Sequence, residues 1–326
     1  MARQSLSLVL DFDGTITTQD TIGLLADIGL QIQQQRRGSD LSVAWQQVLQ
    51  NYDRDHVDHI AAYEPPASER LTLSDELAYL RGLKEVELRS VRRVEQSGIF
   101  RGISTSDLSM AGERARAEGR LKLRDGFAEL MDSAKQNGWS VSVLSVNWSR
   151  SFIKGVLFPY NFDVVANEIE LDGSISGPDV LDASLQNTIM TTCDDKLRAL
   201  RALVNRQGIE RTGGLVYFGD STTDIECLLE TRGVVISTNS ESRLMSTLRR
   251  VGHHVPRIEG YCGSSSIVWA SSFEELLQNR FLSASTQYKC KHVDVRQKVA
   301  NCQEQDAFLA GKRQRYCFKR ETHSIH

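Results

Sequence analysis

The stretch Ser5–Thr15, with the sequence SLSLVLDFDGT, holds the pattern that decides the fold. Ser5–Leu10 is short, mostly apolar and strand-like, and two aspartates, Asp11 and Asp13, follow it at once. In an open parallel sheet, ligands bind beyond the carboxyl ends of the strands. We therefore expect Asp11 and Asp13 to lie at a functional site.

After residue 120, short apolar runs alternate with segments of helical spacing. This alternation predicts an α/β fold with a doubly wound parallel sheet. One hairpin signal interrupts it, at 169–175 around Asp172 and Gly173. The further predicted strands are 139–144, 162–166, 215–218, 234–236 and 267–270. The predicted helices are 127–137, 149–158, 194–206, 224–230, 241–251 and 273–277.

The preceding hundred residues show helical spacing and almost no strand signal. Apolar residues recur every three or four positions over Leu77–Val94, which predicts one helix with Ser74 as its N-cap and Gly98 at its end. Ser104 and Asp107 have the spacing of a capping box for another helix. The organisation predicted from these patterns is a catalytic core of 1–16 and 121–279, a helical cap of 17–120 and a C-terminal tail of 280–326.

The composition is that of a soluble globular protein, with 326 residues, 40% hydrophobic and 25% charged. No run of apolar residues approaches the length of a membrane span. The N-terminal apolar segment is too short for a secretion signal, which predicts a cytoplasmic protein. Six widely spaced cysteines without a C-x-x-C pair favour free thiols over a zinc site.

The tail differs in charge from the rest of the chain. Residues 280–326 contain ten Lys and Arg against four Asp and Glu, whereas the net charge of the whole chain is −3. The segment is polar and has no long apolar period, so we expect a disordered basic extension. A basic tail is more often solvated than bound to nucleic acid, and we expect no nucleic-acid partner.

Polar residues follow three predicted strands and open one predicted helix. They are Asp11 and Asp13, Ser145, Asp220 and Asp224, and Lys196. Carboxylates that meet at one sheet edge repel one another unless a cation lies between them, and oxygen ligands suit Mg²⁺. Lysine and serine can donate to phosphoryl oxygens. The set predicts phosphoryl transfer through an aspartyl phosphate.

The same residues resemble the four motifs of the haloacid dehalogenase superfamily, in that family's order. The resemblance implies that Asp11 is the nucleophile and that Asp13 acts as general acid and base. It also implies that Mg²⁺ is held by Asp11, Asp13, Asp220 and Asp224, and that phosphate is bound by Thr15, Ser145, Val146 and Lys196. The helical insert resembles the cap of the phosphoserine-phosphatase-like branch.

A closer resemblance links the chain to the phosphatase domain of plant thiamine monophosphate phosphatases and to related fungal proteins. It rests on Trp45–Tyr52, Ser97–Ile103, Ala111–Glu113, Leu144–Trp148, Ala166–Glu168 and Gly219–Glu230. This resemblance implies a small phosphorylated metabolite as substrate, with thiamine monophosphate as the leading candidate. Phosphoserine and sugar or polyol phosphates stay open, as do a phosphotransferase and a non-catalytic sensor of phosphate ligands.

Four further residues are candidates for contact with the substrate. Asn147 and Trp148 directly follow Ser145, and Arg101 and Glu113 belong to the predicted cap. Packing is an equal alternative for Trp148, and a surface position is the usual fate of a single arginine. Trp45 and Tyr52 lie at helical spacing, which favours core packing for both. Capping of a loop is at least as good an explanation for Asn167 and Glu168.

Overall fold

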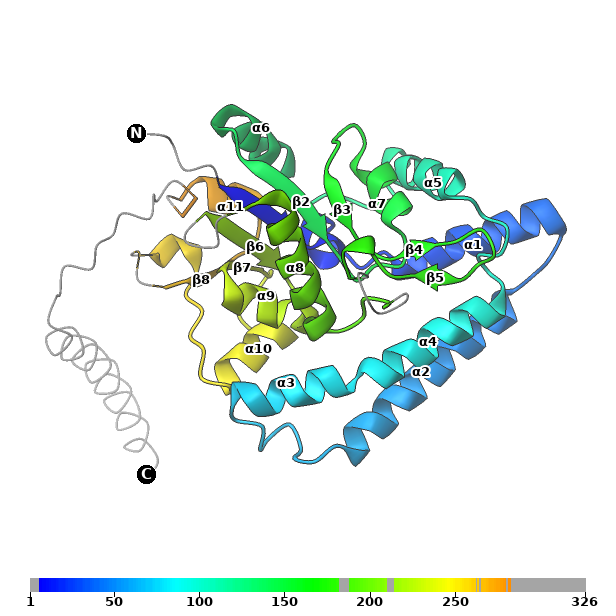
Figure 1. The fold of residues 1–326 in the computed structure, drawn as a ribbon, viewed down its shortest axis with the longest axis horizontal. Helices are drawn as coiled ribbons and strands as arrows, with labels where there is room; N and C mark the ends of the chain where they lie inside the picture. The colour runs from blue at the N-terminus through cyan, green and yellow to red at the C-terminus, as the bar shows by residue number, and fades with distance from the viewer. Residues whose placement is uncertain are drawn as a thin grey trace, which may run out of the picture. The chain divides into compact units, whose positions relative to one another are not determined.

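The computed structural model describes residues 6–181, 188–209, 214–261, 263, 265–279 and 281–282. Within them lies a sheet of six parallel strands in the order β3-β2-β1-β6-β7-β8 (Figure 1). The predicted doubly wound α/β fold is confirmed. The strands of this sheet are β1 (Ser7–Leu10), β2 (Ser140–Leu144), β3 (Asp163–Val165), β6 (Leu215–Gly219), β7 (Arg232–Ile236) and β8 (Ile267–Ala270).

Helices cover both faces of the sheet and form the insert between β1 and β2. The helices of the insert are α1 (Ile22–Arg37), α2 (Ser42–Ala62), α3 (Leu73–Gly82), α4 (Lys84–Ser97) and α5 (Thr105–Ala117). Those beside the sheet are α6 (Phe127–Asn137), α7 (Arg150–Leu157), α8 (Cys193–Gln207), α9 (Ile225–Glu230), α10 (Arg243–Arg250) and α11 (Phe273–Leu277).

Alternation along the strands separates two apolar layers. Leu8 and Leu10 of β1 belong to the cluster that contains the apolar side chains of α6, α7 and α11. Val9 and Tyr217 belong to the other cluster, with side chains of α8, α9 and α10. Since successive side chains of a strand point to opposite faces, a strand buried on both faces must be apolar throughout. This requirement explains the apolar run Leu8–Leu10, which follows the buried Ser7 at the start of β1.

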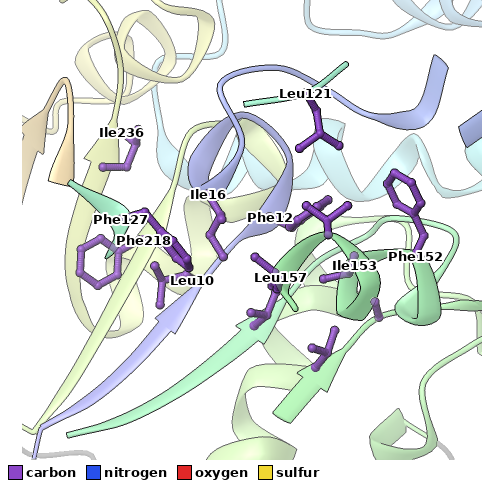
Figure 2. Packing of buried hydrophobic residues seen from close by; sticks show 14 of the residues in the cluster. Leu10, Phe12, Ile16, Leu121, Phe127, Phe152, Ile153, Leu157, Phe218 and Ile236 are labelled. Carbon is purple, nitrogen blue, oxygen red and sulfur yellow. The ribbon is translucent and has the colours of Figure 1, made fainter. Parts of the chain in front are cut away.

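The turn after β1, η1 (Phe12–Ile16), continues this buried row. In Figure 2, the side chains of Leu10 and Ile16 lie beside those of Phe218 and Phe127, and that of Phe12 lies toward Leu157 and Ile153. All three are completely buried. Phe12 separates the two aspartates of the motif and anchors the turn between them. The carboxylates on either side are thereby fixed at the edge of the sheet.

The inserted helices correct one prediction from the sequence. The apolar spacing over Leu77–Val94 predicts one helix, but the chain breaks into α3 and α4 at Leu83. The N-cap is Thr72, whose hydroxyl accepts from the N–H of Asp75, and not Ser74. The break allows α4 to run alongside α2 (Figure 1).

Other predicted boundaries are confirmed. Gly98 ends α4 in the left-handed conformation, with φ 73°, and Ser104 and Asp107 form a complete capping box at α5. The hairpin signal corresponds to the antiparallel pair β4 (Glu168–Ile169) and β5 (Ile175–Ser176).

The end of the described chain extends past residue 279. Phe281 and Leu282 are buried and belong to the same apolar cluster as β1. The remaining residues of the predicted basic tail lie outside the described part of the chain. Among the helices of the described residues, none is long and apolar enough to cross a membrane.

Candidate active site

A cavity of about 730 Å³ opens where the carboxyl edge of the sheet faces the inserted helices. Its wall includes residues after β1, β2 and β6 together with residues of α1, α2 and α4. From the sheet side it is lined by Asp11, Asp13, Gly14, Ser145, Val146, Asn147, Trp148, Thr191, Asp220, Ser221, Thr223 and Arg243. From the inserted segment it is lined by Asp20, Ile22, Gly23, Asp27, Trp45, Val48, Leu49, Tyr52, Glu87, Ser90 and Val91.

The ammonium of Lys196 lies between two carboxylates at the base of this site. Its Nζ is 2.7 Å from Oδ1 of Asp11 and 2.6 Å from Oδ1 of Asp224, and the lysine is completely buried. Burial alone would lower the pKa of Lys196, but the charges of Asp11 and Asp224 outweigh it and raise that pKa. Lys196 therefore stays charged, and it fixes the carboxylate of Asp11.

Asp224 is held from several sides. Its Oδ1 also accepts from the hydroxyl of Tyr217 at 2.6 Å, and its Oδ2 accepts from the backbone N–H of Asp220 and of Ser221. It belongs to the turn η3 (Thr222–Asp224), and no space remains beside Gly219 for a Cβ that would not collide with the Asp224 side chain. These contacts fix the position of the loop after β6 where it approaches Lys196.

Three carboxylates converge tightly enough to hold a metal ion. One oxygen from each of Asp11, Asp220 and Asp224 lies within 4.8 Å of the others. Burial, followed by the charge of Asp224, raises the pKa of Asp220 to about 7, and burial followed by Asp224 also raises that of Asp11. One ammonium does not neutralise this set, and all the donors are hard oxygens. The donor set therefore fits Mg²⁺.

The turn around Gly14 packs closely against the side chain of Asp220. Gly14 has φ 70°, and a Cβ at that position would collide with the carboxylate of Asp220. Only glycine meets both demands without strain. The hydroxyl of Thr15 donates to Oδ1 of Asp220 at 3.0 Å, so Thr15 ties the turn after β1 to the loop after β6.

Asp13 accepts hydrogen bonds on both oxygens. Its Oδ1 accepts from the N–H and the hydroxyl of Thr21, at 2.8 and 2.6 Å, and its Oδ2 accepts from Nδ2 of Asn147 at 2.7 Å. Burial, with a further contribution from Asp20, raises the pKa of Asp13 to about 6 despite these three donors. A carboxyl group with that pKa can both give and take a proton near neutral pH.

The loop after β2 is shaped by its own polar atoms. The hydroxyl of Ser145 accepts from the N–H of Asn147 at 3.2 Å. Asn167 donates to the carbonyls of Val146, Asn147 and Met190, and its Oδ1 accepts from the N–H of Met190. Asn167 thus joins this loop to the chain before α8.

Glu168 also has a structural role. Its carboxylate accepts from the hydroxyls of Ser149 and Ser151, and Ser149 is the N-cap of α7. Glu168 and Ser149 together therefore fix the start of α7, the helix that follows the loop after β2.

Arg124 holds the turn after β1 and was not found from the sequence. Its guanidinium donates to the carbonyls of Thr15 and Gly14 at 2.9 and 2.5 Å, and to the carbonyl of Ser271. A single arginine before a helix has no recognisable spacing. Only the folded chain reveals that it ties the turn after β1 to the end of β8.

The substrate candidates from the sequence separate into two groups. Asn147 and Trp148 line the cavity, and so do Trp45 and Tyr52, for which spacing favoured core packing. Arg101 and Glu113 are exposed and are absent from the cavity wall, and their contact with substrate stays a prediction. Glu113 lies on α5, which packs against α7.

Arg101 follows α4, and its backbone carbonyl accepts from Gln33. Thr15 and Lys196 adjoin the site from behind, because their polar groups are bonded to its carboxylates and neither lines the cavity.

The model of the haloacid dehalogenase-like hydrolases matches residues 8–229, and the chain belongs to this family. The resemblance inferred from the four motifs is confirmed, as is the prediction of a phosphatase-type hydrolase. The matched residues run from β1 through α9 and include all four motifs.

Similar proteins include curated and solved examples. A CTO1 family protein of Schizosaccharomyces pombe is 28% identical over 68% of this chain and 77% of its own length. The mitochondrial Bifunctional TH2 protein of Arabidopsis thaliana is 27% identical over 78% of this chain, which spans only 42% of that protein. A phosphoserine phosphohydrolase-like protein from Francisella tularensis has a TM-score of 0.47 and 16% identity, covering 84% of this chain and 98% of its own.

Proposed function

We propose that this chain is a Mg²⁺-dependent phosphatase that hydrolyses a small-molecule phosphate monoester through an aspartyl phosphate. The observation that carries the proposal is the carboxylate of Asp11 on the cavity wall, fixed from behind by the buried ammonium of Lys196 at 2.7 Å. A carboxylate nucleophile divides a difficult hydrolysis into two displacements.

In the first displacement, an oxygen of Asp11 attacks the phosphorus atom and the bond to the ester oxygen breaks. Asp13 gives its proton to that oxygen, and the alcohol leaves. In the second displacement, Asp13 takes a proton from water, the water oxygen attacks the same phosphorus atom, and Asp11 is released with inorganic phosphate. The pKa of Asp13, raised by burial to about 6, suits both steps.

Phosphoryl oxygens need donors at the cavity wall. Ser145 accepts from the N–H of Asn147, so it can still donate its own hydroxyl proton. We assign phosphate binding to Ser145 and to the backbone of Val146. Thr15 and Lys196, which the family resemblance implies as further phosphate ligands, support the site through Asp220 and Asp11.

Mg²⁺ would be held by the carboxylates of Asp11 and Asp220 and the backbone carbonyl of Asp13, with Asp224 supporting this set. When bound, the ion supplies positive charge that offsets the negative charge of the phosphoryl group. Asp224 already accepts from Tyr217 and Lys196, so we expect its main contribution to be the position of its neighbours.

The substrate is proposed to enter between the core of 1–16 and 121–279 and the cap of 17–120. Thiamine monophosphate is the leading candidate because of the sequence resemblance described above, and phosphoserine and sugar or polyol phosphates are the alternatives. A cap that covers the site favours small metabolites over proteins and nucleic acids. The cytoplasm is the proposed location, and the mitochondrial location in the name of the Arabidopsis relative is the alternative.

The test is phosphate release from a panel of phosphate monoesters with Mg²⁺, using the wild type and Asp11→Asn in parallel. Asparagine keeps the shape and removes the nucleophile, so activity should fall by about three orders of magnitude or more. One ester should be turned over far faster than the others. Weak release that is equal in the variant would contradict the proposal and favour a sensor of phosphate ligands.

A further inference from the structure

The proposed reaction leaves the wall formed by α2 and α4 without a role. Tyr52 and Glu87 face the cavity from this wall, beside Trp45 and Val91. None of these side chains belongs to the four motifs that define the chemistry. Because they lie opposite the phosphoryl site, they are placed to contact the leaving alcohol.

Glu87 is a mostly buried acid that borders the cavity. Its Oε1 accepts from the hydroxyl of Tyr52 at 2.9 Å. Burial raises the pKa of Glu87, and the bond from Tyr52 only partly opposes this effect. Two arginines of α4, Arg89 and Arg93, bind Asp55. The carboxylate of Glu87 therefore borders the cavity with a neutral hydroxyl as its hydrogen-bond donor.

Aromatic rings border the same space. Trp45 and Trp148 meet edge to face, with ring centroids 6.4 Å apart, and both line the cavity. Tyr52 adds a third ring. Aromatic faces attract cations, most strongly in sites sheltered from water. A carboxylate beside such rings is the chemistry that recognises a positively charged organic group.

The charge of the cavity wall agrees with this inference. Among the described residues that line it, the acids Asp20, Asp27 and Glu87 belong to the inserted segment, and Arg243 is the only base. Arg243 is exposed at the start of α10. The charge of Arg243 acts to lower the pKa of Tyr52 and the pKa of His56. The pKa of Glu87 is raised by burial, without a contribution from Arg243.

We propose that Glu87, together with Tyr52, Trp45 and Trp148, forms a subsite for a cationic group on the leaving alcohol, such as a quaternary ammonium or a heteroaromatic cation. The inference rests on the proposed function, because it assigns the substrate class of the same site. Thiamine monophosphate carries a permanent positive charge on its thiazolium ring, whereas sugar and polyol phosphates carry none. The subsite therefore separates thiamine monophosphate from sugar and polyol phosphates, whereas phosphoserine also carries a cationic group, its ammonium.

A matched pair of esters tests the subsite. Phosphocholine and 3,3-dimethylbutyl phosphate have nearly the same shape and differ in one positive charge. We expect the wild type to prefer phosphocholine by about tenfold or more in kcat/KM. Glu87→Gln keeps a hydrogen-bond acceptor for Tyr52 and should reduce this preference to about threefold or less. Glu85→Gln, an exposed position on the same helix, should leave the preference unchanged.

Two results would overturn the subsite: equal kcat/KM for the two esters in the wild type, or a preference for phosphocholine that survives in Glu87→Gln. A preference for an ester with a distal carboxylate would point to Arg243 instead and would also overturn it. Thermal melting of each variant shows whether it is folded.

Binding of free thiamine, followed by calorimetry, separates failure of the subsite from failure of the proposed function. If no ester is hydrolysed but thiamine binds at least tenfold more tightly to the wild type than to Glu87→Gln, only the proposed hydrolysis is wrong. If hydrolysis is robust and thiamine binds both proteins equally, only the subsite is wrong.

Discussion

Lys196 and its neighbours show how single residues set the chemistry of the site. One buried ammonium lies within 2.7 Å of two carboxylates, and a third carboxylate, Asp220, stands close by. The ammonium orients the carboxylate of Asp11 and partly opposes the rise in its pKa that burial and the charge of Asp224 cause, and the carboxylates outnumber the ammonium at the cavity wall. This excess is what a divalent cation would neutralise.

Asp13 gives a pH prediction. As general acid it must be protonated to deliver a proton to the alcohol, and its pKa is raised to about 6, mainly by burial. Its protonated fraction therefore falls as the pH rises through about 6. For an alkyl phosphate, we expect kcat/KM to decline about tenfold for each pH unit above that value.

The leaving group provides the control for this prediction. p-Nitrophenolate leaves without protonation, so the decline with p-nitrophenyl phosphate should be much shallower. The pH profiles of the two esters are to be compared in the same buffers. Equal declines would assign the titration to a group other than the proton donor.

The predictability of single residues depended on recognisable motifs. Asp11, Ser145 and Asp220 follow strands of a parallel sheet, and the topology brings such ends together. Arg124 acts through backbone carbonyls, and Glu87 acquires its place only when α4 packs beside α2. Neither position follows from spacing along the chain, because the contacts are made between distant segments.

Between elements, glycines allow one helix of the insert to approach the sheet's own helices. A Cβ at Gly155 of α7 would collide with the carbonyl of Ser109 on α5, and one at Gly112 would collide with the carbonyl of Phe152. We expect Gly155→Ala to lower the free energy of unfolding by roughly 1–3 kcal/mol, measured with urea.

Gly23→Ala is the matched control for that helix contact. Nothing lies within 4 Å of a Cβ at Gly23, which is also helical. Alanine there should raise the free energy of unfolding by about 0.5–1 kcal/mol. If Gly155→Ala were as stable as the wild type, the close approach of α5 and α7 would be incorrect.

A buried ionic cluster connects α3 to α10. Glu76 binds Arg70 and Arg250, each at 2.8 Å, and the guanidinium of Arg70 lies 3.9 Å from the ring centroid of Tyr79. Glu76→Gln leaves two guanidinium groups without their carboxylate. We expect it to lower the free energy of unfolding by about 3–5 kcal/mol.

Glu69→Gln removes the same charge from an exposed position nearby and should change the free energy of unfolding by less than about 0.5 kcal/mol. Both variants are to be unfolded with urea. Equal effects at positions 69 and 76 would show that the cluster does not stabilise the contact between α3 and α10.

Element boundaries were predictable where a local signal exists. Gly98 indicates the end of α4, and the capping box of Ser104 and Asp107 indicates the start of α5, because both signals depend on residues close together in the sequence. At the break at Leu83 the local signal is weaker: Gly82 precedes it, but the apolar spacing continues through it. Packing of α3 and α4 against different partners decides that break, and a periodic pattern does not reveal partners.

At the scale of the whole molecule, binding of Mg²⁺ should raise the free energy of unfolding. With free Mg²⁺ at 100 times its Kd, the free energy of unfolding should rise by about 2.7 kcal/mol. Asp220→Asn should abolish this gain. At pH 8 in a chelator the variant should be at least as stable as the wild type, because the pKa of Asp220 is raised to about 7 and its charge is unfavourable there.

Calorimetry with and without Mg²⁺ checks both expectations. A gain that persists in Asp220→Asn would place the ion elsewhere. No gain in the wild type, even at millimolar Mg²⁺, would contradict the proposed metal site.

The measurement that tests the central claim most directly is the covalent intermediate itself. The enzyme is mixed with a substrate labelled in its phosphoryl group and quenched in acid within milliseconds. We predict label on the wild-type chain that hydroxylamine releases, as it does from acyl phosphates, and no label on Asp11→Asn. Rapid turnover without labelled protein, or label that persists in the variant, would contradict Asp11 as the nucleophile.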